Sequence, residues 1–156
     1  MKAVVSIVAI ITFLVIAQEV RSDERHCLAE AMYHEARGQG LMGMLAVGVV
    51  IQNRVKHKNY PDTVCGVVRQ GPQWKGNPVR DRCQFSYWCD GRPEKVTDME
   101  SWGQALSVAT TLLTTRVDFA GLEGATHYHA DRIKPVWASG MRQRLHYKQH
   151  VFYSEK

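Results

Sequence analysis

Residues 41–55 are apolar on almost every side when they are drawn as a helix. Met, Leu, Val, Ile and Ala recur through each turn of this range, and polar side chains collect only at its end, as Gln52, Asn53 and Arg54. A helix that is apolar all round is stable only when other elements surround it. The sequence therefore predicts one central buried helix with the rest of a small domain packed around it.

Three other segments carry helix signals. Residues 23–36 have an apolar stripe with Ser22 or Asp23 as the N-cap and Gly38 at the end. Pro61 fits the first turn of a short helix with three valines that stops at Gly71. Thr97 and Glu100 have the capping-box spacing, which predicts a helix to about residue 116.

Two segments lack helical periodicity. Residues 71–93 are rich in Gly, Pro, Gln and Arg and indicate a long ordered loop or a short hairpin. After Gly121 the chain becomes rich in aromatic and histidine side chains. We therefore expect one mainly α domain, an α+β fold with minor β, over residues 23–156.

The first 22 residues look like a targeting segment. Lys2 is followed by an uncharged run from Ala3 to Ala17, and Glu19 and Arg21 close the run. It is shorter than the about 20 apolar residues that span a bilayer, which predicts a signal peptide over residues 1–22, cleaved after Ser22. The alternative is an uncleaved membrane anchor through residues 3–17. Either way we expect the domain to be exported to the periplasm, cell envelope or extracellular space.

The cysteines and the charge agree with export. Cys27, Cys65, Cys83 and Cys89 are an even set, which favours disulfides and leaves three pairings open. They lack metal-ligand spacing, so we expect no metal. The net charge of +5 suits an anionic surface such as a bacterial wall. The basic residues are scattered along the chain, so we expect no nucleic-acid partner.

Glu35 is the candidate catalyst because it lies on the apolar stripe formed by Leu28, Ala31 and Met32. A carboxyl on an apolar face has its charged form disfavoured, which raises its pKa and lets it deliver a proton to a glycosidic oxygen. Glu35 could instead form a buried ion pair with Arg37 or Arg54, or lie in water at a frayed helix end.

The other polar and aromatic side chains give weaker signals. Aromatic residues at 84–88 and 127–137 suit a groove for sugar rings, although Phe85, Tyr128 and Trp137 could equally belong to the core. A catalytic set of histidines with a serine or cysteine nucleophile is not supported, since no G-x-S-x-G elbow occurs.

Several blocks, in order, resemble the cell-wall hydrolases of the spore-cortex-lytic type, SleB-like, which also occur among phage lysins. The matching blocks cover nearly all of the chain after the signal and are residues 34–38 (HEARG), 43–47, 53–55 (NRV), 60–68, 83–86 (CQFS), 124–130 (GATHYHA), 135–138 and 150–153.

The resemblance implies a lysozyme-like single domain related to lytic transglycosylases, with no cofactor and with peptidoglycan as its substrate. By carry-over Glu35 is the single catalytic glutamate, which protonates the bond between N-acetylmuramic acid and N-acetylglucosamine and then deprotonates the sugar's own 6-hydroxyl. The expected substrate-binding residues are Asn53, Phe85, Tyr128 and His129. We expect a monomer.

Two alternatives to this function stay open. One is a hydrolytic muramidase or glucosaminidase, which would need a second carboxylate from Asp62, Asp81, Asp90 or Asp131. The other is a wall-binding protein without catalytic activity. Two departures from the family pattern stand out. Gln39 replaces a second glutamate of many members, and Lys148-Gln149 replace a common Gly-Asn.

Overall fold

The computed structural model describes residue 19 and residues 23–156, so the predicted signal peptide or anchor (residues 1–22) lies almost entirely outside the described range. A helix over residues 23–36 comes first. It is followed by η1 (Arg37–Gln39), α2 (Gly40–Val55), α3 (Val64–Val68), β1 (Gln73–Trp74), β2 (Asn77–Pro78), η2 (Ser86–Cys89), α4 (Met99–Thr114), β3 (His127–Ala130), η3 (Val136–Gly140), β4 (Arg142–Tyr147) and β5 (His150–Ser154). None of the described helices is long and apolar enough to cross a membrane.

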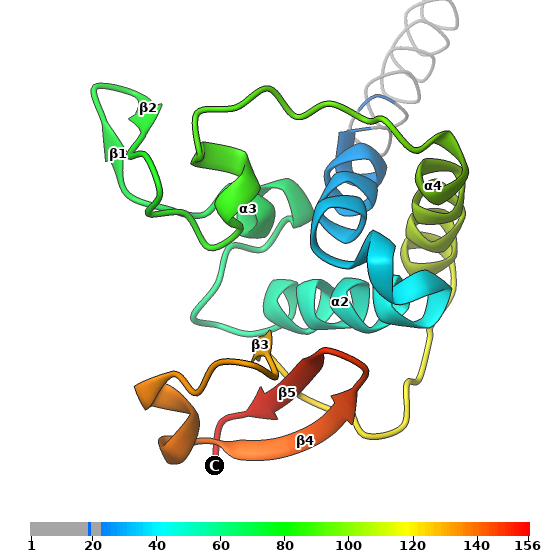
Figure 1. Cartoon of the computed structure of the whole chain (residues 1–156), viewed down its shortest axis with the longest axis vertical. Coiled ribbons are helices and arrows are strands. Elements are labelled where there is room, and N and C mark those ends of the chain that lie inside the picture. The colour runs from blue at the N-terminus through cyan, green and yellow to red at the C-terminus, as the bar shows by residue number, and fades with distance from the viewer. Residues whose placement is uncertain (1–18, 20–22) are drawn as a thin grey trace, which may run out of the picture.

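Helix α2 lies at the centre of the molecule, as its composition predicts. It separates the other α-helices from a small sheet that lies beneath it in Figure 1. Most of its apolar side chains are buried, although Leu41 and Met42 in its first turn are exposed, and it packs against α3 and α4. A side chain at Gly48 would collide with Leu112 of α4 and with Met32 of helix 23–36, so three helices approach one another most closely at this glycine.

The helix boundaries correct two details of the sequence interpretation. Helix α4 is capped by Asp98, whose carboxylate accepts the backbone N–H of Ser101 at 3.0 Å. Thr97 instead gives its backbone N–H to the Tyr33 hydroxyl, so the predicted capping box does not form. Helix α3 is capped by Thr63, and Pro61 precedes the cap rather than entering the first turn.

Both disulfides lie in the first half of the described chain. Cys27 pairs with Cys65 and joins helix 23–36 to α3, while Cys83 pairs with Cys89 beside η2. Glu24 reinforces the first link, because its carboxylate accepts the backbone N–H groups of Val64 and Cys65 at the start of α3.

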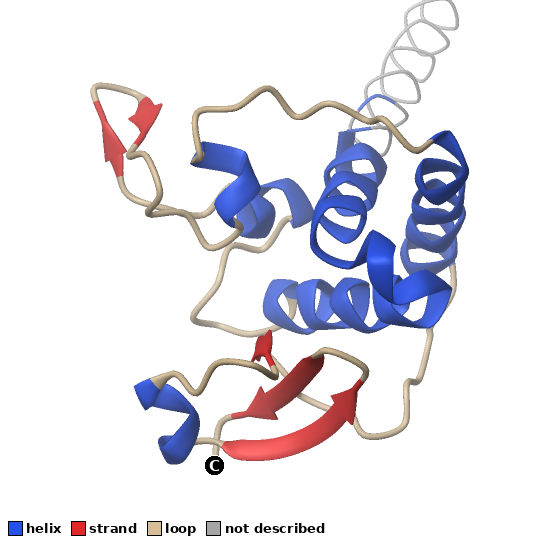
Figure 2. Cartoon of the chain, viewed as in Figure 1, coloured by secondary structure: helices blue, strands red, loops and turns tan. Residues whose placement is uncertain are grey.

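The segment that was predicted as a loop or hairpin forms an arm, β1 and β2, at the upper left of Figure 2. Its two short antiparallel strands are exposed, and the Trp74 side chain is 70% exposed. The C-terminal residues form a three-stranded antiparallel sheet with the order β3-β5-β4. Phe152 on the middle strand is fully buried and joins the sheet to the core under α2.

Candidate active site

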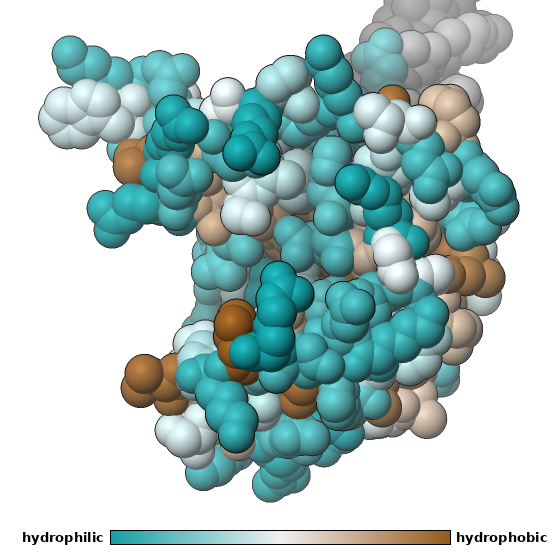
Figure 3. All heavy atoms as spheres, in the orientation of Figure 1, coloured by the Kyte–Doolittle hydropathy of each residue, from teal (hydrophilic) through white to brown (hydrophobic). Residues whose placement is uncertain are grey.

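A groove of about 780 Å³ lies where the helices meet the sheet. Its wall is assembled from the end of helix 23–36, α2, the start of η2, β3, the segment before η3 and the turn between β4 and β5. The lining side chains are His34, Glu35, Gln39, Arg54, Gln84, Ser86, His127, Tyr128, His129, Ala130, Arg132, Ile133, Pro135, Trp137, Gln149 and His150. Figure 3 shows the surface hollowed on the left, between the arm and the part that carries η3.

Glu35 occupies the last turn of helix 23–36 and is partly buried in this groove. Burial raises the pKa of its carboxyl, as the sequence predicts, because removal from water disfavours the charged form. A hydrogen bond from Tyr128 and the positive charge of Arg54 oppose this rise and lower the pKa in part. Burial therefore favours the acid form of the carboxyl, while two neighbours stabilise its ionised form.

Neither alternative for Glu35 is observed. None of the ion pairs in the described chain includes Glu35. Arg37 lies over the Tyr33 ring, with its guanidinium carbon 4.9 Å from the ring centroid. Glu35 is not a solvated helix end either, because the Tyr128 hydroxyl donates a hydrogen bond to its Oε2 at 3.0 Å.

Tyr128 reaches Glu35 from strand β3, 93 positions further along the chain. Its ring packs against His150 and Phe152 of the neighbouring strand β5, with ring centroids 5.1 and 5.7 Å away. Burial, together with the negative charge of Glu35, raises the pKa of Tyr128 well above its ordinary value. Tyr128 is therefore a neutral, fixed hydrogen-bond donor.

The groove is rich in histidines. His129 is buried, and its two ring nitrogens lie 2.9 Å from the Ala130 carbonyl and 3.0 Å from the Tyr153 hydroxyl. Burial lowers the pKa of His34, His127 and His150. These three rings are therefore neutral at neutral pH and offer polar but uncharged edges to the groove.

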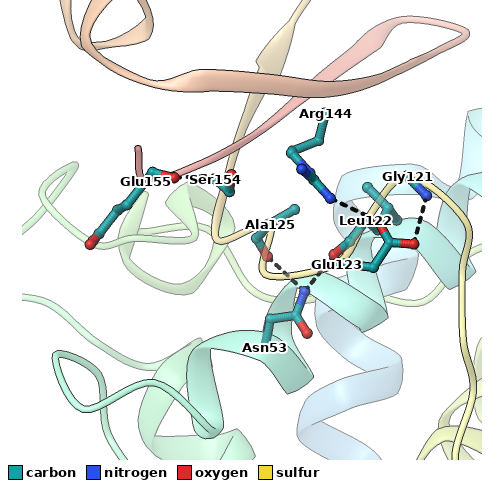
Figure 4. Close-up of polar contacts among 8 residues, drawn as sticks. All are labelled: Asn53, Gly121, Leu122, Glu123, Ala125, Arg144, Ser154 and Glu155. Carbon is teal, nitrogen blue, oxygen red and sulfur yellow. Dashed lines mark hydrogen bonds and ion pairs between the residues drawn. The ribbon is translucent and has the colours of Figure 1, made fainter.

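Two of the four predicted substrate-binding residues are not on the groove surface. The Asn53 amide donates to the carbonyls of Leu122 and Ala125, at 2.9 Å each, and lines a different pocket (Figure 4). Phe85 is 1% exposed and belongs to the core. Asn53 thus fastens the turn that leads into β3, and Phe85 supports the groove from beneath. Tyr128 and His129 do line the groove.

Glu35 is the single carboxyl among the groove-lining residues. Of the other candidate acids, Asp131 faces His146 at 3.6 Å in a neighbouring pocket, and Asp90 accepts the backbone N–H of Arg92. Asp62 and Asp81 are exposed and do not line the groove. Within the described residues, no three His, Cys, Asp or Glu side chains converge in a way that could hold a metal ion.

The two departures from the family pattern contact each other at one end of the groove. Gln39 donates from its amide to the Gln149 side chain at 3.1 Å and accepts the Gln149 backbone N–H at 3.3 Å. The Lys148 ammonium donates to the Gln39 carbonyl at 2.6 Å. Gln39 is 7% exposed and thus acts as a link between the helices and the β4–β5 turn.

The most informative site residue that the sequence interpretation missed is Arg54. We treated it as part of the polar end of a buried helix and as an alternative ion-pair partner. In the structure its guanidinium is buried against the groove. An arginine that ends an otherwise apolar buried helix was the available signal. Arg132, Gln84 and Ser86 were also missed, and nothing in their spacing marks them.

The sequence of this chain is similar to those of known proteins. Residues 38–153 match the model of the Cell Wall Hydrolase family. Spore cortex-lytic enzymes of Halalkalibacterium halodurans and Bacillus cereus are 46% identical to this chain over 41 residues. The aligned part is 26% of this chain but only 12% and 16% of those proteins, so the chain matches a small part of their length.

Two solved structures share the fold. The catalytic domain of the Bacillus cereus SleB protein has a TM-score of 0.59 and 23% identity, over 85% of this chain and 91% of that domain. The catalytic domain of the germination-specific lytic transglycosylase SleB from Bacillus anthracis has a TM-score of 0.61 and 27% identity, over 84% and 93%. These similarities confirm the expected α+β, lysozyme-like fold and the SleB-like resemblance.

Proposed function

Because this chain belongs to the cell wall hydrolase family, we propose that it cleaves the glycan strands of bacterial peptidoglycan with Glu35 as acid and base. The observation that carries the proposal is a single buried carboxyl, with a raised pKa, in a groove bordered by aromatic and neutral imidazole side chains. A carboxyl that remains protonated near neutral pH can donate its proton to a glycosidic oxygen.

The proposed reaction is a lytic transglycosylation in two proton transfers. Glu35 first gives its proton to the oxygen that leaves as the bond from N-acetylmuramic acid to N-acetylglucosamine breaks. The carboxylate then takes the proton of the 6-hydroxyl of the same muramic acid, and that oxygen bonds to the anomeric carbon. The product is a 1,6-anhydromuramoyl end, and Glu35 is protonated again without consumption of water.

The surroundings of Glu35 fit these two steps. Tyr128 donates to Oε2, which leaves the other carboxyl oxygen, Oε1, for the proton that is transferred. An ordinary glycosidase uses two carboxyl groups on either side of the scissile bond, about 5 to 9.5 Å apart. Since Glu35 is the one carboxyl that lines this groove, its geometry favours the reaction in which the sugar supplies its own nucleophile.

Replacement of Glu35 tests the proposal. The change Glu35→Gln keeps the shape of the side chain but removes the transferable proton, so we expect release of muropeptides from purified sacculi to fall below detection. Mass spectrometry of the products of the unchanged protein should show anhydro ends. Glu30→Gln is the control, because Glu30 lies on the same helix, is also partly buried with a raised pKa, and does not line the groove.

Each other outcome has a defined meaning. Retained lysis by Glu35→Gln would remove Glu35 from the chemistry. Products that carry one added water would make the enzyme a hydrolase with a second acid elsewhere. No release by the unchanged protein, together with binding to sacculi, would indicate a wall-binding role.

A further inference from the structure

We propose that Arg54 is a positioning residue for the reaction: its buried guanidinium stabilises Glu35 in the ionised form that exists between the two proton transfers. The role assigned to Glu35 is the one proposed above. The proposed effect is that of the Arg54 charge on the ionisation of Glu35, and a titration measures it without an assay of lysis.

Arg54 is held rigidly in the wall of the groove. Its residue is 5% exposed, and its Nε donates a hydrogen bond to the Thr126 carbonyl at 2.7 Å. The guanidinium carbon lies 5.3 Å from the ring centroid of Tyr60 and 5.5 Å from that of Phe85. An arginine clamped in this way cannot swing into water, so its charge is fixed beside the groove.

One nitrogen of the Arg54 guanidinium makes no hydrogen bond. Its Nη1 is buried and has no hydrogen-bond partner, and none of the ion pairs formed by the described residues includes Arg54. A buried charge without a counter-charge is costly, and guanidinium groups remain protonated in proteins. A negative charge close to the Arg54 guanidinium would therefore lower the free energy of this buried cation.

Glu35 is the group that can supply that charge, since it is the one carboxyl in the same groove. Among the other titratable groups near Glu35, Tyr128 on β3 and Tyr87 on η2 are neutral, because burial raises their pKa. Burial lowers the pKa of His34, His127 and His150, which line the groove, and Arg132, the other cation of the lining, is exposed. The positive charge that acts on the Glu35 carboxyl is that of Arg54. The charges of both Glu35 and Arg54 also act on the pKa of Tyr128, so the three side chains lie close enough to influence one another's ionisation.

This arrangement matches the demands of a single-carboxyl reaction. Burial raises the pKa of Glu35 and so favours its protonated form before the bond breaks, and the fixed cation limits the cost of the carboxylate that forms when the proton leaves. Because Arg54 is already oriented, no reorganisation is needed at that moment. Without the cation, the first proton transfer would leave an anion in apolar surroundings with one hydrogen bond as its only support.

The test is a titration of the Glu35 carboxyl in the full chain. Carbon-13 label at the glutamate carboxyl groups reports each titration by NMR, and the Glu35 signal is the one that disappears in Glu35→Gln. We expect Arg54→Met to raise the pKa of Glu35 by about one unit or more, a tenfold change in its ionisation constant. Arg54→Lys keeps the charge and should leave the titration close to that of the unchanged protein.

Arg37→Met is the control for loss of a nearby charge, because Arg37 is two positions from Glu35 but is exposed. It should not move the titration. If a thermal melt shows that Arg54→Met is unfolded, Arg54→Gln takes its place, since its amide can still donate to the Thr126 carbonyl. The same upward shift is expected.

An unchanged Glu35 titration in a folded Arg54→Met or Arg54→Gln protein would overturn the proposal and leave Arg54 with a purely structural role. This result is independent of the sacculus assay. Lysis that survives Glu35→Gln would refute the proposed function even if Arg54 controls the Glu35 titration.

Discussion

The helices that carry Glu35 and Arg54 and the strands that carry Tyr128 meet in one groove, but the two regions are held together differently. The helical region has a central helix whose apolar side chains are mostly buried and a disulfide between Cys27 and Cys65. The sheet has no disulfide, and polar side chains of α2 fasten it to the helices. Asn53 holds the turn before β3, and Arg54 holds the carbonyl of Thr126. Glu35 thus lies in a region held by apolar burial and a covalent link, whereas the strand that carries Tyr128 is held by polar contacts with α2 in addition to the buried Phe152 of β5.

Removal of the Cys27–Cys65 disulfide should have the largest effect on stability. It closes a loop with a sequence separation of 38 residues, against 6 for Cys83–Cys89. The loop-entropy relation gives a loss of roughly 4 kcal/mol for the first link and roughly 2 kcal/mol for the second. The measurement is urea unfolding of Cys27→Ala/Cys65→Ala beside Cys83→Ala/Cys89→Ala. Equal losses in the two double variants would contradict the idea that the first link is the main covalent support of the helices.

The change Asn53→Ala removes hydrogen bonds that join helix α2 to the turn before the sheet. It removes the Asn53 amide from the carbonyls of Leu122 and Ala125, of which only that of Leu122 keeps a second donor among the described residues, the backbone N–H of Ala125. This loss should cost about 1 to 3 kcal/mol. Because this turn leads into β3, amide hydrogen exchange should become faster over residues 121–128 while the exchange of α2 stays slow. Gln52→Ala, at the preceding position and on the same pocket, is the control. Uniformly faster exchange would show that the sheet and the helices unfold as one unit.

The change Tyr128→Phe should have the smallest effect on stability, about 1 kcal/mol, because it removes one hydrogen bond and keeps the ring. Its effect is electrostatic. The hydrogen bond lowers the pKa of Glu35, so its loss raises that pKa further. In the proposed mechanism lysis requires protonated Glu35 and falls as the pH rises through this pKa, so the alkaline limb of the pH profile should move to higher pH. Tyr153→Phe, which removes the partner of His129 instead, should leave that limb in place.

Sequence reasoning succeeded where the signal is local. The spacing of apolar residues predicted helix 23–36 and the buried helix α2, and the position of Glu35 on an apolar stripe predicted that burial raises the pKa of its carboxyl. The strands of the C-terminal sheet were not placed because their patterns do not alternate. β5 is the middle strand and is buried on both faces, so it reads as a continuous run. β4 is interrupted by a register shift between Gln143 and Leu145.

The part of the site that the sequence could not predict is which residues far apart in the chain contact one another. All four substrate-binding residues were expected from the resemblance and from their polar or aromatic character, but the contact of Tyr128 with Glu35 depends on the pairing of β3 with β5. Residue type and motif do not distinguish a residue on the groove surface, such as His129, from one beneath it, such as Phe85. The cap of α4 moved by one residue because Tyr33, 64 positions away, takes the N–H of Thr97.

The Cys27–Cys65 link also bears on how the molecule would respond to a protease. Residues 27–65 form a closed covalent ring that contains Glu35, Asn53 and Arg54. A cut at one peptide bond within this ring leaves all its residues in one molecule. A cut in the exposed segment 91–95 leaves no covalent bond between this ring and the strand that bears Tyr128, because neither disulfide crosses that segment. After proteolysis Glu35 and Arg54 remain in one molecule, and the strand that bears Tyr128 is the part that can dissociate.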